Sequence, residues 1–357
     1  MDLIFELSDV FYTGSDEIIS PKDESHFIGE VITNRIAGIV YVNLQKTKSS
    51  FSREVDNALV AIYHDYVDRA KKFKSNISYL SHIFRDVNFK YALLKGALLT
   101  TTLYQEGQRI SNDIDILVNK EDVSSLQKIL RDNGFVQGWY SRKQKKIKIA
   151  SRMEIIHASM NFGETVPFIK LIENEPLAID INFSFDFKTS KKEMVSKFLD
   201  DSIFINNGEF SFSTLDYIDF FIHLCCHLYK EATTFHWVDV RKDLTLYKFS
   251  DINLFLHKFG NKDFFDKLVL RIKQFAVEQE CYYTMINSLI VYPKMESIEG
   301  FQNSIQLIKP LNLYFMKQII HPVENKLFKY NMSFTDWYFC KNRVAYLEEI
   351  KNEKLNI

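Results

Sequence analysis

Cysteine, proline and glycine are all scarce in this chain. Its 357 residues include 4 cysteines, 6 prolines and 11 glycines. The cysteines show neither a Cys-x-x-Cys metal spacing nor the density of a disulfide scaffold, so a reducing compartment fits best. The few prolines and glycines argue against repeat arrays of turns, and no internal repeat or low-complexity linker is visible.

A strong net charge and long apolar runs are also absent. The 45 basic and 46 acidic residues leave a formal charge of −1, so no whole-molecule field would draw the protein to nucleic acid, although a local basic patch remains open. No stretch reaches membrane-spanning length, and the first residues do not form a basic segment followed by an apolar core. We therefore expect neither secretion nor membrane insertion, and a cytoplasmic location.

What the chain does have is apolar content for large cores, because 46% of its residues are hydrophobic. Residues 1–88 are predicted to form a mainly helical region, since apolar positions between 51 and 73 recur three to four apart. Short alternating strands and helices are expected over 89–210. Residues 211–357 are again predicted to be helical, with a helix starting near 214–216. The predicted fold class is α+β, with a central α/β core between two helical regions.

Paired carboxylates carry the best evidence for chemistry. Asp113 and Asp115 lie in the run Asp-Ile-Asp-Ile-Leu-Val, so in a strand they would project from the same face. Two carboxylates on one face repel unless a cation lies between them, and their oxygens suit a hard divalent ion such as Mg2+ shared with substrate phosphates. The alternative is a solvated strand end, because Asp-x-Asp also arises by chance in a chain with many acidic residues.

A third carboxylate is available at Asp180, in the alternating stretch 177–183, which is predicted to be another strand. A neighbouring strand would bring it beside the first two, and two-metal phosphoryl transfer requires such a set. Glu154 is the rival third carboxylate, since residues 153–157 are also expected to form a strand.

Phosphate-binding residues are predicted just upstream of the pair. A short apolar run ends at Lys95-Gly96 and is followed by residues that can form a helix, which indicates strand, turn and helix. Gly96 would let the backbone approach a phosphate, with the following N–H groups favouring an anion. Lys95 and Arg109 could add positive charge to a triphosphate site. Each is equally explained as a solvated or structural residue, and Ser111, with Asn112, could simply shape the loop.

These motifs together resemble the DNA polymerase beta-like nucleotidyltransferase superfamily, and more closely the bacterial uncharacterised nucleotidyltransferases whose turn is Lys-Gly. The resemblance extends over residues 35–251, and only its central motif is specific. Its elements are Leu94-Lys95-Gly96, Gly107-x-Arg109, Asp113-x-Asp115-Ile-Leu-Val and Asp180 in a later strand.

The resemblance implies a small mixed β-sheet flanked by helices, with Asp113, Asp115 and Asp180 holding two Mg2+ or Mn2+ ions and the phosphates of an NTP lying over Gly96. In the wider superfamily the residue after that glycine is commonly serine or glycine, and here it is Ala97. A hydroxyl contact to phosphate is therefore absent, which leaves room for altered or lost catalysis.

Two weaker signals come from the C-terminal region. His223 and His227 are four residues apart on a predicted helix, which is a metal-ligand spacing, but the His-Glu-x-x-His glutamate of a zinc hydrolase is missing. Packing in the core is the simpler interpretation, with a nucleotide or acceptor contact as the other. Lys242 lies in the charged run 239–243, which could close over a triphosphate or form an ordinary charged helix surface.

One dense basic run, residues 141–148, follows Trp139 and Tyr140. Its simplest interpretation is a solvated hairpin, and the functional one is a clamp on an anionic acceptor such as RNA, a phosphosugar or a carrier-bound substrate.

The sequence thus predicts a metal-dependent nucleotidyltransferase that moves a nucleoside monophosphate from an NTP to a small-molecule or peptide acceptor and releases pyrophosphate. A toxin-like enzyme acting on tRNA or protein is the first alternative. A catalytically silent nucleotide-binding scaffold is the second, and a zinc hydrolase is more distant.

Overall fold

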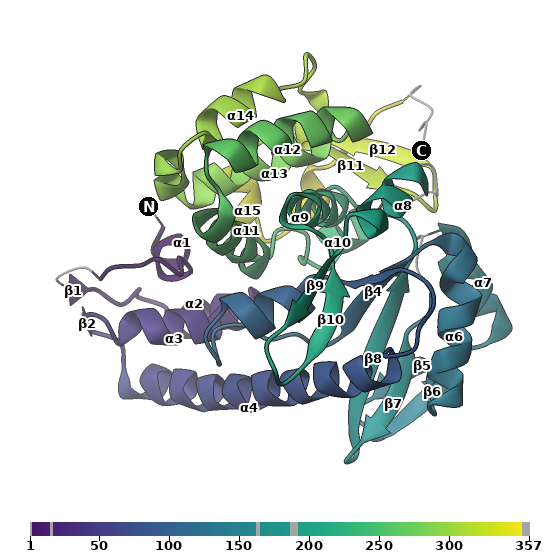
Figure 1. Cartoon of the computed structure of the whole chain (residues 1–357). Coiled ribbons are helices and arrows are strands. Elements are labelled where there is room, and N and C mark those ends of the chain that lie inside the picture. The colour runs from purple at the N-terminus through teal and green to yellow at the C-terminus, as the bar shows by residue number, and fades with distance from the viewer. Residues whose placement is uncertain (1, 15–16, 162–164, 186–191, 352–357) are drawn as a thin grey trace. The chain divides into compact units, whose positions relative to one another are not determined.

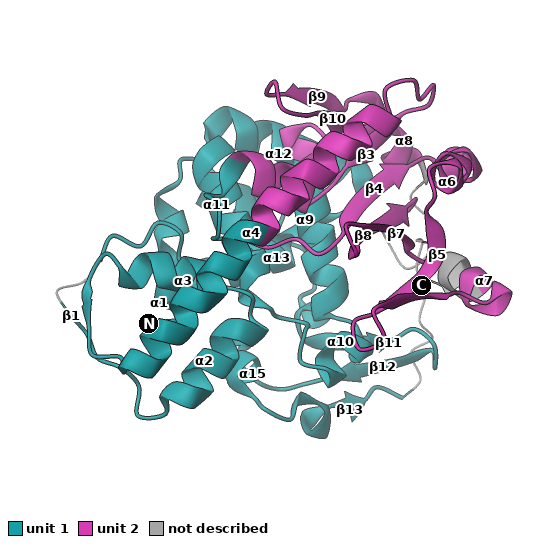
Figure 2. Ribbon diagram, turned by 90° about the horizontal axis from the view of Figure 1, so that it is seen from below, with its two compact units in different colours: residues 1–68, 103–109, 221–357 teal, residues 69–102, 110–220 magenta. Residues whose placement is uncertain are grey.

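The chain has an α+β fold, as the sequence predicts, in a computed structural model that describes residues 2–14, 17–161, 165–185 and 192–351. It divides into two compact units, coloured separately in Figure 2. Unit 1 consists of residues 1–68, 103–109 and 221–357, and unit 2 of residues 69–102 and 110–220. Each unit is described by itself.

Unit 2 contains a six-stranded sheet with the strand order β3-β4-β8-β7-β5-β6 (Figure 1). Strands β4 and β8 are parallel and the other neighbours are antiparallel, so the sheet is mixed. In chain order the strands are β3 Tyr91–Leu93, β4 Ile114–Val118, β5 Val136–Ser141, β6 Lys146–Ile149, β7 Phe168–Ile172 and β8 Glu175–Asn182.

Two helices cover one face of this sheet. Helix α4, Arg53–Ile83, directs Phe73, Ile77 and Leu80 into the core, and α6, Val123–Asp132, adds Leu126 and Leu130. Their spacings of three and four residues form the apolar stripe of an amphipathic helix. The sheet contributes alternate side chains to the same core, among them Leu93, Ile114, Ile116, Leu177, Ile179 and Ile181. The opposite sheet face is therefore left to the residues between them.

The remaining elements of unit 2 surround this sheet. A short helix and a π-helical segment follow β3. The separate two-stranded hairpin β9-β10 packs beside β3, where the Thr214 hydroxyl donates to the Leu93 carbonyl at 2.6 Å. The bounds are α5 Gly96–Leu98, η1 Leu99–Leu103, η2 Lys120–Asp122, α7 Arg152–Asn161, α8 Lys192–Asp200, β9 Ile203–Asn206 and β10 Ser211–Thr214.

Unit 1 is mainly helical, with two small sheets. Its helices are α1 Leu3–Leu7, α2 Glu24–Thr33, α3 Ala37–Leu44, α9 Tyr217–Ala232, α10 Phe235–Asp239, α11 Leu246–Phe259, α12 Lys262–Phe275, α13 Glu278–Val291, η4 Pro293–Ser297, α14 Phe301–Leu307, η5 Tyr314–Lys317, α15 Phe334–Phe339 and η6 Arg343–Tyr346. Its strands are β1 Glu17–Ile18, β2 Lys48–Ser49, β11 Gln318–His321, β12 Lys326–Lys329 and β13 Glu348–Glu349. Helices α4 and α9 continue from one unit into the other.

Buried polar contacts join the N-terminal segment of unit 1 to its C-terminal helices. The hydroxyl of Tyr292 lies 2.8 Å from Oγ of Ser8 and 2.8 Å from Oγ of Ser250. Asn43 donates to the carbonyls of Leu7 and Asp9. The compact units, which are defined by contacts between residues, place residues 1–68 and 221–357 together in unit 1. The ranges predicted from the sequence, 1–88 and 211–357, instead treat these two regions as separate.

Candidate active site

Two of the predicted carboxylates are direct neighbours in the sheet of unit 2. Asp115 on β4 is the register partner of Asp180 on β8. The isoleucines on either side of them enter the core, so both aspartates lie on the opposite face. Asp115 is buried, with 7% of its surface exposed, and Asp180 is half-buried. The β8 strand and its aspartate are therefore placed as the alternating sequence pattern predicts.

Asp113 is placed differently. Strand β4 begins at Ile114, so Asp113 lies in the bend before the strand and is exposed. The strand alternation that predicted a shared face for Asp113 and Asp115 therefore does not extend to Asp113. Its carboxylate belongs to a loop, which can adjust its position more easily than a strand residue can.

Lys95 contacts Asp115 directly. Its Nζ lies 2.9 Å from Oδ1 of Asp115, and the Asn182 amide donates to the same oxygen at 3.4 Å. Asn182 was not anticipated as a site residue, although its position two residues after Asp180 on an alternating strand puts it on the same face. The aspartate face thus carries two carboxylates, an ammonium group and an amide.

The turn at Lys95 has an unusual backbone. Lys95 has a φ of 44°, a conformation that costs a residue with a Cβ on the order of 1–3 kcal/mol and is often found at functional sites. Gly96 then begins α5, which has three residues and continues as the π-helix η1. Strand, turn and helix follow one another as predicted, and π-helical turns are also frequent at functional sites.

Ser111 belongs to the same unit and contacts this helical segment. Its hydroxyl lies 3.0 Å from Oγ1 of Thr100 on η1, while the neighbouring Asn112 accepts a hydrogen bond from Arg69. These contacts shape the loop before β4 through side chains.

Arg109 lies in unit 1, whereas Lys95 and the aspartates lie in unit 2. Its Nε and Nη2 atoms form a two-point ion pair with Asp251, at 2.8 and 2.9 Å. The Arg109 side chain is 6% exposed and the Asp251 side chain 5%. Burial opposes the charge of Arg109, but Asp251 outweighs it and the pKa of Arg109 is raised. The pair gives Arg109 a structural role, and its predicted contact with phosphate stays a prediction.

The expectation that Glu154 lies on a strand is wrong. Residues 152–161 form helix α7, and Glu154 is exposed in its first turn. The Ser151 backbone N–H donates to Oε2 of Glu154 at 2.8 Å, and the Glu154 N–H donates to Oγ of Ser151 at 3.3 Å. This is a capping box, and these hydrogen bonds lower the pKa of Glu154. The Ser-x-x-Glu spacing was the signal for a helix start.

His223 and His227 lie on α9, with ring centroids 6.2 Å apart in a stacked arrangement. His223 is buried, as a core residue would be. Nε2 of His227 lies 3.4 Å from Oε1 of Glu231. Both histidines are in unit 1, so the structure does not place them in the unit that holds the aspartates.

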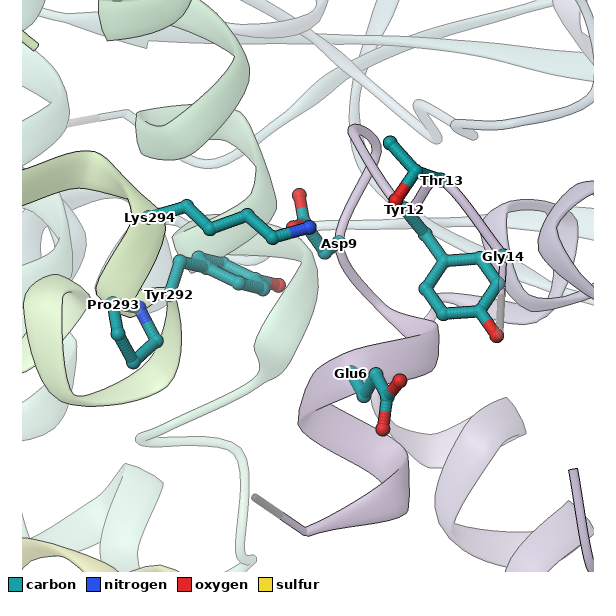
Figure 3. A pocket seen from close by; sticks show the side chains of 8 residues that line it. All are labelled: Glu6, Asp9, Tyr12, Thr13, Gly14, Tyr292, Pro293 and Lys294. Atoms are coloured by element: carbon teal, nitrogen blue, oxygen red, sulfur yellow. The ribbon is translucent and has the colours of Figure 1, made fainter. Parts of the chain in front are cut away.

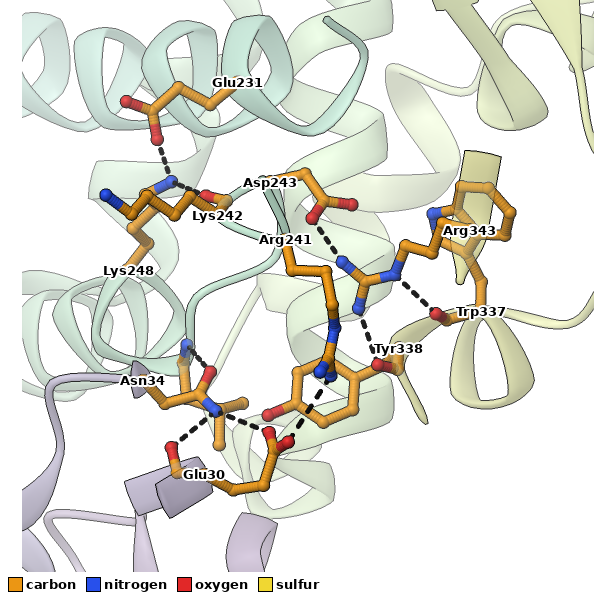
Figure 4. A network of polar contacts seen from close by, with 11 residues as sticks. Glu30, Asn34, Glu231, Arg241, Lys242, Asp243, Lys248, Trp337, Tyr338 and Arg343 are labelled. Carbon is orange, nitrogen blue, oxygen red and sulfur yellow. Dashed lines mark hydrogen bonds and ion pairs between the residues drawn. The ribbon is translucent and has the colours of Figure 1, made fainter. Parts of the chain in front are cut away.

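Lys242 is exposed in the loop before α11, within a polar network of unit 1 (Figure 4). Its carbonyl accepts from Lys248 at 3.1 Å, and Lys248 also pairs with Glu231. In the same network the buried Asp243 pairs with the buried Arg343, which also donates to the Trp337 carbonyl at 2.8 Å (Figure 4). Burial raises the pKa of Asp243, while Arg343 acts in the opposite direction. The loop is therefore anchored by structural contacts.

Two cavities of unit 1 do not include any predicted site residue. One, of about 270 Å³, lies beside η4, with Lys294 extended toward Asp9 and with Glu6 and Tyr12 on the other side (Figure 3). Asp9 already accepts hydrogen bonds from the Phe11 N–H and the Asn253 amide. The other cavity, of about 720 Å³, lies between the segment 313–318 and the ends of β12 and β13. The candidate site is defined here by strand register.

Within residues 2–14, 17–161, 165–185 and 192–351, no group of three or more histidine, cysteine, aspartate or glutamate side chains is arranged to hold a metal ion. No helix among the described residues is long and apolar enough to cross a membrane.

The sheet of unit 2 is mixed, as the sequence resemblance implies. Residues 20–289 match the sequence profile of a family described as uncharacterised nucleotidyltransferase. The chain belongs to this family and is a nucleotidyltransferase. No curated protein matches the chain. The matched range contains both aspartates, the turn and α9, and it ends before η4.

Proposed function

We propose that this enzyme transfers a nucleoside monophosphate from an NTP to an acceptor hydroxyl, with Mg2+ or Mn2+ held by Asp113, Asp115 and Asp180. The bond formed joins the acceptor oxygen to the α-phosphorus, and the bond broken is the α–β anhydride, so that pyrophosphate leaves and the hydroxyl proton passes to water. The register pairing of Asp115 with Asp180 carries the proposal. A polymerase beta-like ancestry is part of the same proposal.

The donor set fits a hard divalent cation in its chemistry. Carboxylate oxygens are the ligands that Mg2+ prefers, and Asp115 and Asp180 offer them from adjacent strands. The three carboxylates are not grouped as a metal site in the described part of the structure, so Asp113 would have to move in from its exposed loop. When bound, the metal would neutralise phosphate charge and lower the pKa of the attacking hydroxyl.

The chain's own groups would position the triphosphate. Lys95 holds the Asp115 carboxylate at 2.9 Å, and an ammonium on a flexible stem can turn from that carboxylate to a phosphate oxygen. Gly96 would allow the phosphates to approach the backbone. Because α5 has only three residues, the positive charge of Lys95 matters more here than a helix dipole.

The silent-scaffold alternative rested on Ala97, and its surroundings weaken that argument. Ala97 is 1% exposed and belongs to the core with Leu93 and Ile116. A serine hydroxyl at this position would start from the core side of the turn. The absence of a serine at position 97 therefore does not by itself remove a phosphate contact. An assay of pyrophosphate release distinguishes an active enzyme from a silent scaffold.

The deciding experiment measures melting temperature with each of the four NTPs, with Mg2+, Mn2+ or EDTA, for the wild type and for Asp115→Asn/Asp180→Asn. A ligand at 100 times its Kd adds about 2.7 kcal/mol of stability, so a metal-dependent shift with one NTP is expected in the wild type alone. Glu175→Gln, on the exposed start of β8, is the matched control and should keep the shift.

A shift that persists in the aspartate variant would place the nucleotide elsewhere and overturn the proposed site. Nucleotide binding without pyrophosphate release, with any acceptor supplied, would favour the scaffold alternative. The acceptor expected from the sequence is a small molecule or peptide. One observation favours the tRNA alternative, namely the basic hairpin of the same sheet.

A further inference from the structure

The hairpin formed by β5 and β6 concentrates positive charge at the edge of the six-stranded sheet. Five cationic side chains lie in or beside its turn, all of them exposed: Arg142, Lys143, Lys145, Lys146 and Lys148. No acidic residue occurs between positions 133 and 153. The whole chain carries a formal charge of −1, so this hairpin is a local basic patch on a protein that is otherwise close to neutral.

The register between β5 and β6 shows which hairpin side chains project from the same side of the sheet. Trp139 pairs with Lys148, and Ser141 pairs with Lys146, so the indole and both ammonium groups project from the same side. Lys146 and Lys148 are two strand residues apart, about 7 Å, a separation comparable with that of successive phosphates along an extended single strand. Trp139 is 39% exposed, whereas Trp337 is 1% exposed.

Neighbouring residues extend this arrangement. Gln137, two residues before Trp139, accepts a hydrogen bond from Nη2 of Arg131 at 3.1 Å, which adds a cation to the Trp139 side. Gln137 pairs with the core residue Phe168, so Trp139 lies on the core side of the sheet. Tyr140 projects from the other side, which is also the side of Asp115 and Asp180.

Protection of a sheet edge does not explain all of this. Lysines on an edge strand prevent pairing with other chains, which accounts for Lys146 and Lys148. It does not account for a half-exposed indole between cations, for Ile149 at 71% exposure, or for three further cations in the turn. A cationic strip with an exposed ring is the combination that binds single-stranded nucleic acid, by phosphate contacts and base stacking.

We propose that the β5-β6 hairpin binds single-stranded RNA, with Lys146 and Lys148 on successive phosphates and a base stacked on Trp139. An acidic peptide would satisfy the charges but offers no base to stack on the indole, and an anionic membrane is distinguished by the measurement with phosphatidylserine vesicles. The inference rests on the proposed function only where the bound strand is taken to be the acceptor. The binding itself requires neither NTP nor metal.

The test is fluorescence anisotropy of a labelled single-stranded RNA of about 12 nucleotides, without NTP or metal, from about 50 to about 200 mM salt. Each phosphate contact contributes about 0.7 to the slope of log affinity against log salt concentration. Lys146→Ala/Lys148→Ala should therefore reduce the slope by about 1.4. The matched control Lys71→Ala/Lys128→Ala removes two exposed lysines from α4 and α6 and should leave the slope unchanged.

Trp139→Ala should weaken binding about 5- to 160-fold at constant slope, because stacking on one base is lost. Trp139→Phe should recover part of the affinity. RNA should also quench tryptophan fluorescence in the wild type and not in Trp139→Phe.

Absence of RNA binding at low salt, or equal slopes for the hairpin and control variants, would overturn the proposal. So would equal competition by polyglutamate, or preferential binding to phosphatidylserine vesicles. Asp115→Asn/Asp180→Asn should bind RNA like the wild type, so failure of the proposed catalytic site and failure of this proposal give different results.

Discussion

The Nζ atom of Lys95 lies 2.9 Å from Oδ1 of Asp115, and Asp115 is the register partner of Asp180. Lys95 therefore supplies a positive charge to a carboxylate whose partner on the neighbouring strand is a second aspartate. The Lys95 side chain is 20% exposed and that of Asp115 10%, so water screens the pair only partly. A cation bound to Asp115 would have to share it with this ammonium group.

Lys95→Met should reveal that competition. Without the ammonium, Asp115 loses a partner and faces Asp180, so the free energy of unfolding in EDTA should fall by about 1–3 kcal/mol. Mg2+ should then stabilise the variant more than the wild type, because it replaces the missing charge. Urea unfolding with and without Mg2+ measures both effects.

Lys90→Met is the matched control for this variant. Lys90 also lies in unit 2 and its Nζ is 2.7 Å from Asp200, but both side chains are more than half exposed. Exposed pairs contribute about 0–1 kcal/mol, so only a small change is expected. Equal Mg2+ responses in the wild type, Lys95→Met and Lys90→Met would show that Lys95 does not compete with a metal ion.

The Arg109–Asp251 pair predicts a stability effect that is independent of nucleotide. Arg109→Lys keeps the charge but loses the two-point geometry, and Asp251→Asn leaves the buried guanidinium without its counter-charge. Breaking a buried pair costs about 3–5 kcal/mol, so Asp251→Asn should be strongly destabilised and Arg109→Lys less so. Arg69→Lys, on the exposed pair with Asn112, should change stability by less than about 0.5 kcal/mol.

Nucleotide affinity then decides the role of Arg109. If Arg109→Lys, assayed where it remains folded, binds the NTP like the wild type, the pair is structural. If Arg109→Lys instead loses more NTP affinity than its loss of folding stability explains, the predicted contact between Arg109 and phosphate is supported.

The capping box of α7 predicts a pH dependence. Hydrogen bonds from Ser151 lower the pKa of Glu154 below the ordinary value of 4.5, so its stabilising contribution is present above about pH 4.5 and is lost as the pH falls through the folded-state pKa. The melting temperature of the wild type should exceed that of Glu154→Gln near neutral pH, and the difference should shrink in acid. Glu121 is also an exposed glutamate in unit 2, so Glu121→Gln is the control for the loss of one surface charge. A difference that grows in acid would contradict the assignment.

Gly38 predicts a steric effect in unit 1. A Cβ at Gly38, in helix α3, would lie 1.7 Å from the carbonyl oxygen of Gly107, which is backbone and cannot turn away. Gly38→Ala should therefore destabilise the protein by about 1–3 kcal/mol or more. Gly29→Ala, in helix α2 with nothing within 4 Å of the added Cβ, should instead stabilise it by about 0.5–1 kcal/mol. Thermal unfolding of both variants checks the contrast, and equal effects would refute the predicted close packing at Gly38.

The sequence predicted those parts of the fold that depend on local pattern. The alternation of Leu177, Ile179 and Ile181 predicted β8 and put Asp180 on the free face, because period-2 burial is visible without tertiary information. The strand, turn and helix around Lys95 were predicted from a short apolar run that ends at Lys95-Gly96 and is followed by residues that can form a helix. Residues 153–157 were wrongly expected to be a strand, since a short apolar run is ambiguous between strand and helix. The spacing of Ser151 and Glu154 is the signal that indicates a helix start.

The rest depended on partners remote in the chain. Nothing near Arg109 indicates Asp251, which lies 142 positions later. The positive φ of Lys95 could not be predicted either, because residues with a Cβ seldom adopt it. Likewise, the grouping of residues 1–68 with residues 221–357 follows from buried bonds such as that of Ser8 with Tyr292, which the sequence pattern does not show.

The buried pair of Asp243 and Arg343 bears on where this protein can be divided. Asp243 lies inside the range that matches the family, residues 20–289, and Arg343 lies outside it. A chain ended at residue 289 would retain the motifs of a nucleotidyltransferase but leave a buried carboxylate without its counter-charge. The last part of the chain therefore completes the fold of unit 1, so the boundary of the family match is not a boundary of folding.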